Sequence, residues 1–205
     1  MSRIFVVTGT DTGVGKTVFA AGLAAALCGF YWKPVQAGTE DGTDAATVAA
    51  LGVAPERILP EAYRLATPCS PHRAAAIDGL TIDPARLALP EVSGALVVEG
   101  AGGVLVPLAG ELLYADLFAH WRAPVILVAR TALGTINHSL LSLEALRIRG
   151  VPVHGIAFVG DPEPESEATI AELGCVRRLG RLPRLDPLDA ASLAPAFADA
   201  FPDFA

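Results

Sequence analysis

The residues best suited to chemistry in this sequence form the run GTDTGVGKT, from Gly9 to Thr17. Glycines allow backbone N–H groups to close around a phosphate, and a helix that starts after them adds the positive end of its dipole. Lys16 would then reach the β- and γ-phosphates of a nucleotide, and the Thr17 hydroxyl would bind magnesium. A glycine-rich turn can also serve packing alone, but GKT at a helix start is far more specific. The spacing is unusual, because five residues separate Gly9 from Gly15 where the standard loop has four.

Charged residues in or beside apolar runs are the candidate partners of this loop. Glu99 ends the run ALVVEG, and an acid at the carboxyl end of a buried strand lies where ligands bind to a parallel sheet. Apolar strands also end in solvated carboxylates, but beside the loop Glu99 is a candidate magnesium ligand. Lys33 interrupts the run YWKPVQAG, where it needs an anion as partner if buried, unless it snorkels at a strand end. Asp41 and Asp44 precede a helical pattern, where acids often act as caps.

Secondary-structure elements must position these residues. Short apolar runs alternate along the chain with longer helical patterns, and this alternation is typical of parallel βαβ units. Several apolar runs lack polar alternation, as expected when helices cover both faces of a sheet. We therefore predict an α/β fold with a doubly wound, mainly parallel sheet, and the length suits one domain over residues 1–205. The segment from about Leu59 to Leu89 has no clear assignment. The predicted strands are 4–8, 31–35, 95–100, 124–130 and 153–159, and the predicted helices are 16–27, 44–51, 135–149 and 164–173.

Composition restricts the class of protein. Apolar residues make up 52% of the chain and charged residues 18%, and the net charge is −7, which favours a soluble, well-buried protein over a nucleic-acid binder with a basic surface. No apolar run approaches the ~20 residues that span a bilayer, and the start of the chain has no secretion-signal pattern, so we expect the cytoplasm. Cys28, Cys69 and Cys175 are widely spaced and are predicted to be buried, reduced thiols.

Five motifs, in this order along the chain, resemble those of the dethiobiotin synthetases, enzymes that close the ureido ring in biotin synthesis with ATP. The motifs are GTDTGVGKT, YWKPVQAGTEDGTDA, SPHRAA, VVEGAGGVLVPL and LGTINHSL, and the resemblance extends to about Asp161. It implies a P-loop NTPase fold whose glycine loop carries the extra residue, which brings Thr12 close to the substrate. The implied substrates are 7,8-diaminononanoate, carbon dioxide or bicarbonate, and ATP with magnesium.

The resemblance also implies roles for particular residues. Lys33 and Lys16 would be the catalytic lysines, and Thr17, Asp44 and Glu99 the magnesium ligands, which moves Asp44 from cap to ligand. The implied residues for ATP and magnesium are Thr12, Gly13, Val14, Gly15, Lys16, Thr17, Val18, Asp44, Glu99, Gly100, Ala101, Gly102, Val159, Gly160, Leu182, Pro183 and Arg184. Those for the diamine are Thr12, Lys33, Ala37, Ser70, Pro71, Gly102, Gly103 and Asn137. Asn137 would reach across a homodimer interface to the carboxylate tail of the substrate.

Two positions depart from the family pattern. Ala37 stands where family members commonly have serine or threonine, so a contact to the diamine is lost or replaced. Val159 stands where relatives have an asparagine that reads the adenine edge, and a valine side chain makes no hydrogen bonds. We therefore predict weaker discrimination among nucleoside triphosphates.

A dimeric regulatory ATPase of the partition or positioning type is the rival interpretation, since such switch proteins share the fold. They carry a lysine early in the loop, where this chain has Thr10 and Asp11. The stretch LDAASLAPAFADAFPDFA is acidic, where a membrane-targeting helix would be basic. Both features favour the synthetase.

Overall fold

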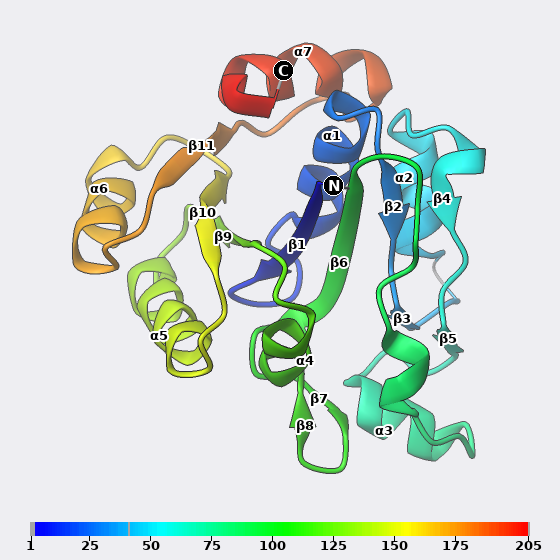
Figure 1. Ribbon diagram of the computed structural model, residues 1–205. Coiled ribbons are helices and arrows are strands. Elements are labelled where there is room, and N and C mark those ends of the chain that lie inside the picture. Colours follow the sequence, from blue (N-terminus) through cyan, green and yellow to red (C-terminus); the bar gives the residue numbers. More distant parts are fainter. Residues whose placement is uncertain (1–2, 41, 205) are drawn as a thin grey trace.

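A seven-stranded parallel sheet forms the centre of the computed structural model, which describes residues 3–40 and 42–204 (Figure 1). Asp41 lies outside the described residues. The strands are β1 (Ile4–Gly9), β2 (Phe30–Trp32), β4 (Ile58–Leu59), β6 (Leu96–Gly103), β9 (Val125–Arg130), β10 (Val153–Val159) and β11 (Arg178–Leu182). Their order is β11-β10-β9-β1-β6-β2-β4, and every neighbouring pair is parallel. The predicted doubly wound α/β fold is confirmed.

β1 occupies the position at which the strand order reverses. The chain leaves β1 for β2 and β4, returns to pair β6 with one side of β1, and later places β9 on its other side. Ligands of open α/β sheets bind at the carboxyl ends of the strands next to such a switch point. The loop after β1 and the end of β6 therefore lie side by side at this edge.

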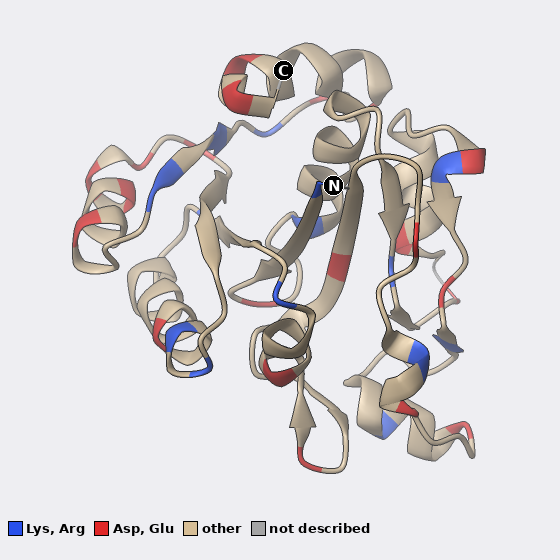
Figure 2. Cartoon of the chain, viewed as in Figure 1, with Lys and Arg blue, Asp and Glu red and all other residues tan. Residues whose placement is uncertain are grey.

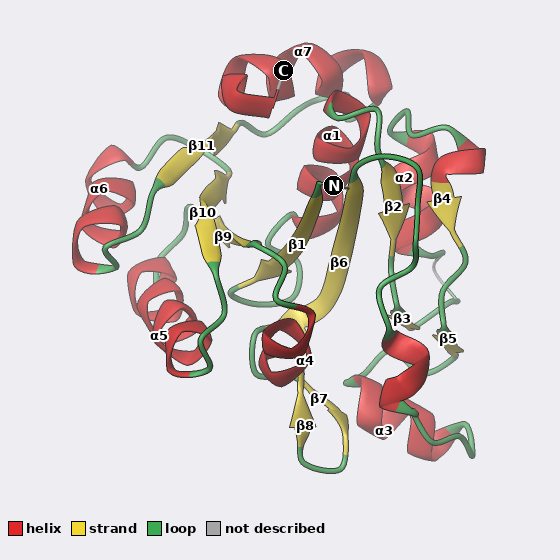
Figure 3. Cartoon of the chain, viewed as in Figure 1, coloured by secondary structure: helices red, strands yellow, loops and turns green. Residues whose placement is uncertain are grey.

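Helices cover both faces of the sheet (Figure 3). Alternate residues of β1 point to opposite faces, so that Val6 belongs to one apolar cluster while Phe5 and Val7 belong to the other. The helices α1 (Lys16–Ala26), α2 (Asp44–Ala50) and α7 (Ala190–Ala200) contribute to the second cluster. The helices α3 (Pro71–Ile77), α4 (Tyr114–Trp121), α5 (Thr135–Ile148) and α6 (Pro164–Leu173) contribute to the first. This is the two-layered burial expected from strands without polar alternation.

The predicted strand 31–35 is wrong as a single element. β2 ends at Trp32, and β3 (Val35–Ala37) begins after Pro34 and pairs with β5 (Tyr63–Leu65) in a separate two-stranded sheet. Proline has no backbone N–H to donate to a ladder, which accounts for the break. β6 runs three residues beyond the predicted strand end at 100, as far as Gly103. The other predicted elements agree with the structure to within one residue at each end.

The predicted elements leave out several that the structure contains, most of them short. This group includes the helices α3, α4 and α7 and the strands β4, β5 and β11. It also includes an antiparallel hairpin of β7 (Pro107–Ala109) with β8 (Leu112–Leu113). The remaining members are the 3₁₀ helices Pro55–Arg57, Pro84–Leu87 and Pro202–Phe204. α3 and β5 lie in the segment 59–89 that had no assignment.

All three cysteines are free thiols, as predicted, but their predicted burial is wrong. Cys28 and Cys175 are exposed, and Cys69 is half-buried. Cys28 and Cys175 have φ angles of +45° and +41° in the turns that follow α1 and α6, so the chain reverses direction there and leaves both side chains at the surface. Among the described residues, no helix combines the length and the apolar character needed to cross a membrane.

Candidate active site

The phosphate loop spans residues 10–15, between the end of β1 and the start of α1. The N–H of Thr10 donates to the carbonyl of Val128 at 3.0 Å, which ties the loop to β9. Gly15 has a φ of +94°, and a Cβ there would lie 2.9 Å from Cγ1 of Val159, so only glycine fits this position. Lys16 is buried, and its Nζ donates to the carbonyl of Asp11 at 2.7 Å. The strand, loop and helix predicted from GTDTGVGKT are present.

Lys33 lies at the centre of an anionic cluster. Its Nζ is 2.5 Å from Asp44 Oδ2 and 2.9 Å from Glu99 Oε1, and it donates to the carbonyl of Gly100 at 3.1 Å. The Thr17 hydroxyl faces the same two carboxylates, at 3.1 Å from Asp44 Oδ1 and 2.9 Å from Glu99 Oε1. Lys33 and Glu99 are only 4% and 0% exposed. The expectation that a buried Lys33 requires anionic partners is confirmed, and snorkelling to solvent is excluded.

Strand geometry explains why these groups meet. β2 and β6 are neighbours, with Tyr31 in register with Val97 and Trp32 with Val98. Glu99 follows Val97 by two residues, so it points to the same face as Val97 and lies near Tyr31. The hydroxyl of Tyr31 donates to Glu99 Oε2 at 2.8 Å. Figure 2 shows one acidic band on β6, whose only charged residue is Glu99.

Asp44 is held at the first residue of α2. The side chain of Thr43 accepts a hydrogen bond from the N–H of Ala46, which makes Thr43 the N-cap. The reading of Asp44 as a cap is therefore wrong. The backbone N–H of Asp44 donates to Gln36 Oε1 at 3.0 Å, while Gln36 Nε2 donates to the carbonyl of Gly38 at 3.0 Å. The Asp44 carboxylate is thereby directed to Lys33 and Thr17.

The two lysines differ in their electrostatic surroundings. Burial, followed by the neighbouring charge of Lys33, lowers the pKa of Lys16 to about 8. Burial alone would also lower the pKa of Lys33, but the charges of Glu99 and Asp44 outweigh it and raise that pKa above its usual range. Burial and then the charge of Glu99 raise the pKa of the Tyr31 hydroxyl, which keeps this group a hydrogen-bond donor.

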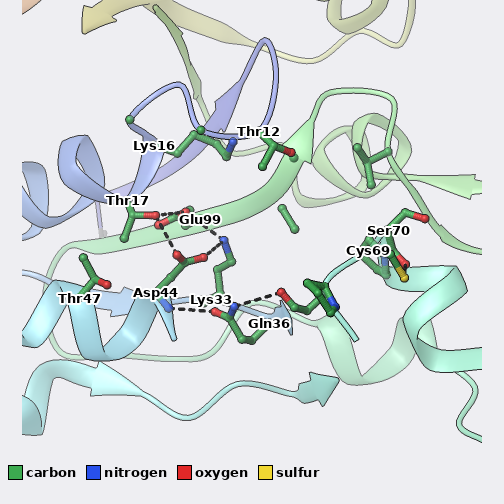
Figure 4. A pocket seen from close by; sticks show the side chains of 18 of the residues that line it. Thr12, Lys16, Thr17, Lys33, Gln36, Asp44, Thr47, Cys69, Ser70 and Glu99 are labelled. Carbon is green, nitrogen blue, oxygen red and sulfur yellow. Dashed lines mark hydrogen bonds and ion pairs between the residues drawn. The ribbon is translucent and has the colours of Figure 1, made fainter. Parts of the chain in front are cut away.

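Lys16, Lys33 and the carboxylates of Asp44 and Glu99 line one cavity of about 690 Å³. Figure 4 shows Lys16 and Thr17 from α1 on one side, Lys33 and Asp44 below, and Cys69 and Ser70 from the connection before α3 at the far end. The predicted residues that line it are Thr12, Gly13, Gly15, Lys16, Thr17, Val18, Lys33, Ala37, Asp44, Ser70, Pro71, Glu99, Ala101 and Gly102. Residues from four separate parts of the sequence thus meet around this space.

The remaining predicted site residues lie outside the lining of this cavity. Val14 is a buried residue of the phosphate loop itself, while Gly100 and Gly103 belong to β6. The residues predicted for the base lie at the ends of β10 and β11, where the N–H of Gly160 donates to the carbonyl of Leu182 at 3.0 Å. They are Val159, Gly160, Leu182, Pro183 and Arg184. Asn137 is exposed on the first turn of α5.

Sequence reasoning missed several groups of the site. Gln36 and Thr47 line the cavity together with Pro68, Cys69 and Val106, and Tyr31 lies behind Glu99. The position of Tyr31 two residues before Lys33 was an available signal, because residues two apart on an extended strand point to the same face. Gln36 gave no signal of its own, because its partner Asp44 is brought to it by the turn into α2.

The fold and the site together define a phosphate-loop nucleotide-binding protein with a doubly wound parallel sheet. A family model described as an AAA domain matches residues 3–192. The chain is 69% identical to the ATP-dependent dethiobiotin synthetase BioD of Rhizorhabdus wittichii, over 98% of this chain and 97% of that protein. Identity to the protein of the same name from Novosphingobium aromaticivorans is 65%, over 96% of each chain. The chain therefore belongs to the family of ATP-dependent dethiobiotin synthetases.

A solved structure of the septum site-determining protein MinD from Pyrococcus horikoshii, complexed with Mg-ADP, has a TM-score of 0.59 to this chain. The match covers 100% of this chain and 94% of MinD at 16% sequence identity. At this identity the likeness shows the fold alone, so it does not favour the regulatory ATPase.

Proposed function

We propose that this chain converts 7,8-diaminononanoate, carbon dioxide and ATP into dethiobiotin, ADP and phosphate. The observation that carries the proposal is the placement of two buried lysines, Lys16 and Lys33, in one cavity with the phosphate loop. A path that accumulates negative charge on a carboxylated amine and on a transferring phosphoryl group requires cations in such a place.

The proposed chemistry has three steps. One amine of the substrate adds to carbon dioxide and loses a proton to give a carbamate. A carbamate oxygen then attacks the γ-phosphorus of ATP, ADP leaves, and a carbamic–phosphoric anhydride results. The second amine attacks the carbonyl carbon of the anhydride and loses a proton, phosphate leaves with the bonding electron pair, and the ureido ring closes. In these steps Lys33 would neutralise the carbamate and the γ-phosphate, and Lys16 the β- and γ-phosphates.

Magnesium would be held by Thr17, Asp44 and Glu99. Two carboxylates and one hydroxyl converge there, and this small set of hard oxygen donors suits an ion that keeps waters and binds nucleotide phosphates. Among residues 3–40 and 42–204 there is no cluster of three or more His, Cys, Asp and Glu side chains that could hold a metal ion alone. When bound, magnesium supplies positive charge to the phosphate oxygens.

The diamine would occupy the part of the cavity between the phosphate loop and the start of α3. Thr12, Ala37, Ser70, Pro71 and Gly102 line that space, and Gly103 follows at the end of β6. Gly102 has a φ of +64°, and a Cβ there would lie 2.8 Å from Val106, so the backbone of β6 reaches the cavity without a side chain. A short, flexible diamine could then approach the β6 backbone closely.

The partner we propose is a second copy of this chain. A further cavity of about 310 Å³ lies between the residues after β6 and α5, lined by Leu105, His138 and Leu141 among others. Leu105 and Leu141 are exposed, as is Leu133 just before α5. Asn137 on the first turn of α5 would then contact the tail carboxylate of the substrate bound by the partner, where the helix N-terminus favours an anion. We place the dimer in the cytoplasm, where ATP is supplied.

We propose that the base of ATP binds beside the ends of β10 and β11. The residues there are Val159, Gly160, Leu182, Pro183 and Arg184. Val159 contacts Gly15 of the phosphate loop, so this segment adjoins the bound phosphates. β10 and β11 lie on the opposite side of β1 from β2, the strand that precedes Lys33, as expected for the base end of the nucleotide.

One assay tests the proposed function. Purified protein is incubated with diaminononanoate, bicarbonate and magnesium-ATP, and phosphate release is measured together with dethiobiotin by mass spectrometry. We expect phosphate release to depend on the diamine and to match dethiobiotin formation, and Lys33→Ala to abolish both. Phosphate release that is the same without the diamine would favour the regulatory ATPase instead.

A further inference from the structure

The four carboxylate oxygens beside Lys33 have distinct partners. Glu99 Oε2 accepts from the Tyr31 hydroxyl at 2.8 Å, and Glu99 Oε1 accepts from Lys33 at 2.9 Å and faces the Thr17 hydroxyl at 2.9 Å. Asp44 Oδ1 faces the Thr17 hydroxyl at 3.1 Å, and Asp44 Oδ2 lies 2.5 Å from Lys33 Nζ. A lysine ammonium therefore binds both carboxylates that the proposed function assigns to magnesium.

Tyr31 restricts how a metal could use Glu99. The Tyr31 side chain is fully buried, and its hydroxyl occupies Oε2. An ion that bound Oε2 would compete with this buried donor for the lone pairs of that oxygen, and the loss of a buried donor's partner is costly. Oε1 is the Glu99 oxygen that faces Thr17, the other proposed ligand, and it already accepts from Lys33.

Two cations on the same oxygen of Glu99 repel each other. The repulsion is strong here because Lys33 is 4% exposed and Glu99 is not exposed at all, so water and salt do little to screen it. Magnesium needs its oxygen ligands at about 2.0–2.1 Å, closer than any present contact of these carboxylates. An ion at that distance takes the place of the ammonium.

We propose that the Lys33 ammonium and the divalent ion compete for Asp44 and Glu99, so that arrival of the metal-nucleotide releases Lys33 toward the substrate. Lys33 lines the cavity, and its flexible side chain allows the ammonium to turn into it. The carbonyl of Gly100, its third partner, also belongs to β6 beside the cavity. The inference rests on the proposed function for the identity of the metal site, and it makes metal loading a condition for the action of Lys33.

Metal binding by two lysine variants tests this competition. Manganese binding to the nucleotide-free protein is measured by electron paramagnetic resonance of the free ion, for wild type, Lys33→Met and Lys16→Met. Lys16→Met is the matched control, because it removes one positive charge from the same cavity without touching Asp44 or Glu99. We expect Lys33→Met to bind manganese roughly tenfold more tightly than wild type, because its carboxylates lack their cation. We expect Lys16→Met to stay within about threefold, since its charge acts only at longer range.

Equal or weaker manganese binding by Lys33→Met would overturn the inference, and so would an equal gain in both variants, which would reflect net charge alone. Because the measurement needs no diamine, a wild-type protein that makes dethiobiotin while Lys33→Met shows no gain contradicts the competition and leaves the proposed function intact.

A wild-type measurement covers the case in which Lys33→Met does not fold. In crystals of wild-type protein with manganese and a non-hydrolysable ATP analogue, the anomalous signal is expected beside Asp44 and Glu99, with Lys33 Nζ beyond hydrogen-bond distance of Glu99 Oε1. An ammonium that still contacts Glu99 Oε1 beside the bound ion would refute the exchange.

Discussion

Val159 contacts the phosphate loop directly at Gly15, where a Cβ would lie 2.9 Å from the Val159 Cγ1 atom. Three backbone groups of Val159 and Gly160 are also hydrogen-bonded within the protein. The carbonyl of Val159 accepts from the N–H of Thr131 at 3.1 Å, the N–H of Gly160 donates to Leu182, and the carbonyl of Gly160 accepts from Arg181 at 2.9 Å. The segment that we propose to lie beside the base therefore offers few free groups with which to read it.

We accordingly expect the wild-type protein to use CTP and GTP at rates within about tenfold of the ATP rate, because no side-chain amide favours adenine. Val159→Asn supplies such an amide and should raise the preference for ATP over CTP by about fivefold, the value of one net hydrogen bond. Diamine-dependent phosphate release with each triphosphate measures this preference. A strong preference of the wild type for ATP would contradict the prediction.

Thr43 and Asp44 have separate tasks at the start of α2, and two variants should separate them. Thr43→Ala removes the N-cap and should lower the free energy of unfolding by about 1 kcal/mol, with an unchanged magnesium requirement. Asp44→Asn keeps the cap but removes a charged ligand candidate, so it should raise the magnesium concentration needed for half-maximal activity about tenfold or more. Urea unfolding and magnesium titrations give the two readouts. If Asp44→Asn loses stability while its magnesium dependence stays at the wild-type value, Asp44 is structural.

His154 should make the stability of the protein depend on pH. Burial, and then the charges of Arg177 and Arg3, lower its pKa below the ordinary value of 6.5 in spite of Asp203. The unfolded chain therefore binds a proton at His154 at a higher pH than the folded chain does, so stability falls as pH drops below 6.5.

The variant His154→Phe removes the titrating group but keeps an aromatic ring. A phenyl ring can pack there, because the imidazole centroid lies 5.1 Å from that of Phe5 and 5.9 Å from that of Phe204. Between about pH 7.5 and about pH 5.5, the Tm of the wild type should decrease more than that of His154→Phe. Parallel curves for the two proteins would show that His154 does not contribute to this dependence.

One of the two exposed leucines that line the second cavity provides a test of the dimer. Leu141 on α5 is 56% exposed, and a charge in a buried interface is strongly unfavourable. Leu141→Asp should convert a wild-type dimer into monomers at micromolar concentration, as measured by light scattering. Leu173→Asp on α6, which is 65% exposed and lies outside both cavities, is the matched control and should remain dimeric. A wild-type protein that is monomeric under these conditions excludes the proposed interface.

Sequence reasoning was most accurate where local pattern decides the structure. Long apolar runs predict β1, β9 and β10 well, because strands covered on both faces need no polar alternation. The glycine loop is predicted equally well, because its residue types and spacing lie within one short segment. The contacts of Lys33 are different, because Glu99 lies 66 residues away in the sequence. The position of Lys33 inside an apolar run indicates that it needs an anion, but the pairing of β2 with β6 is what brings Glu99 to it.

The elements that escaped prediction are short or depend on tertiary contacts. β4 has two residues and β5 three, and a strand of this length carries too few side chains to show a period. α4 has eight residues and begins directly after β8, so its apolar pattern merges with that of the hairpin. α7 contains Pro195, which normally argues against a helix interior.

The small sheet of β3 and β5 stands apart from the central sheet, and its last strand leads to Pro68, Cys69, Ser70 and Pro71 at the far wall of the cavity. That wall therefore comes from a separate small sheet and α3, although Tyr63, Leu65 and Ala74 pack into the first apolar cluster with the central strands. Exchange of the lining residues Pro68, Cys69 and Ser70 alone would reshape which amine is accepted, while the buried residues of β5 and α3, the cations and the glycine loop stay in place. The architecture thus offers engineers a route to new cyclic ureas that leaves the energy-coupling half of the enzyme untouched.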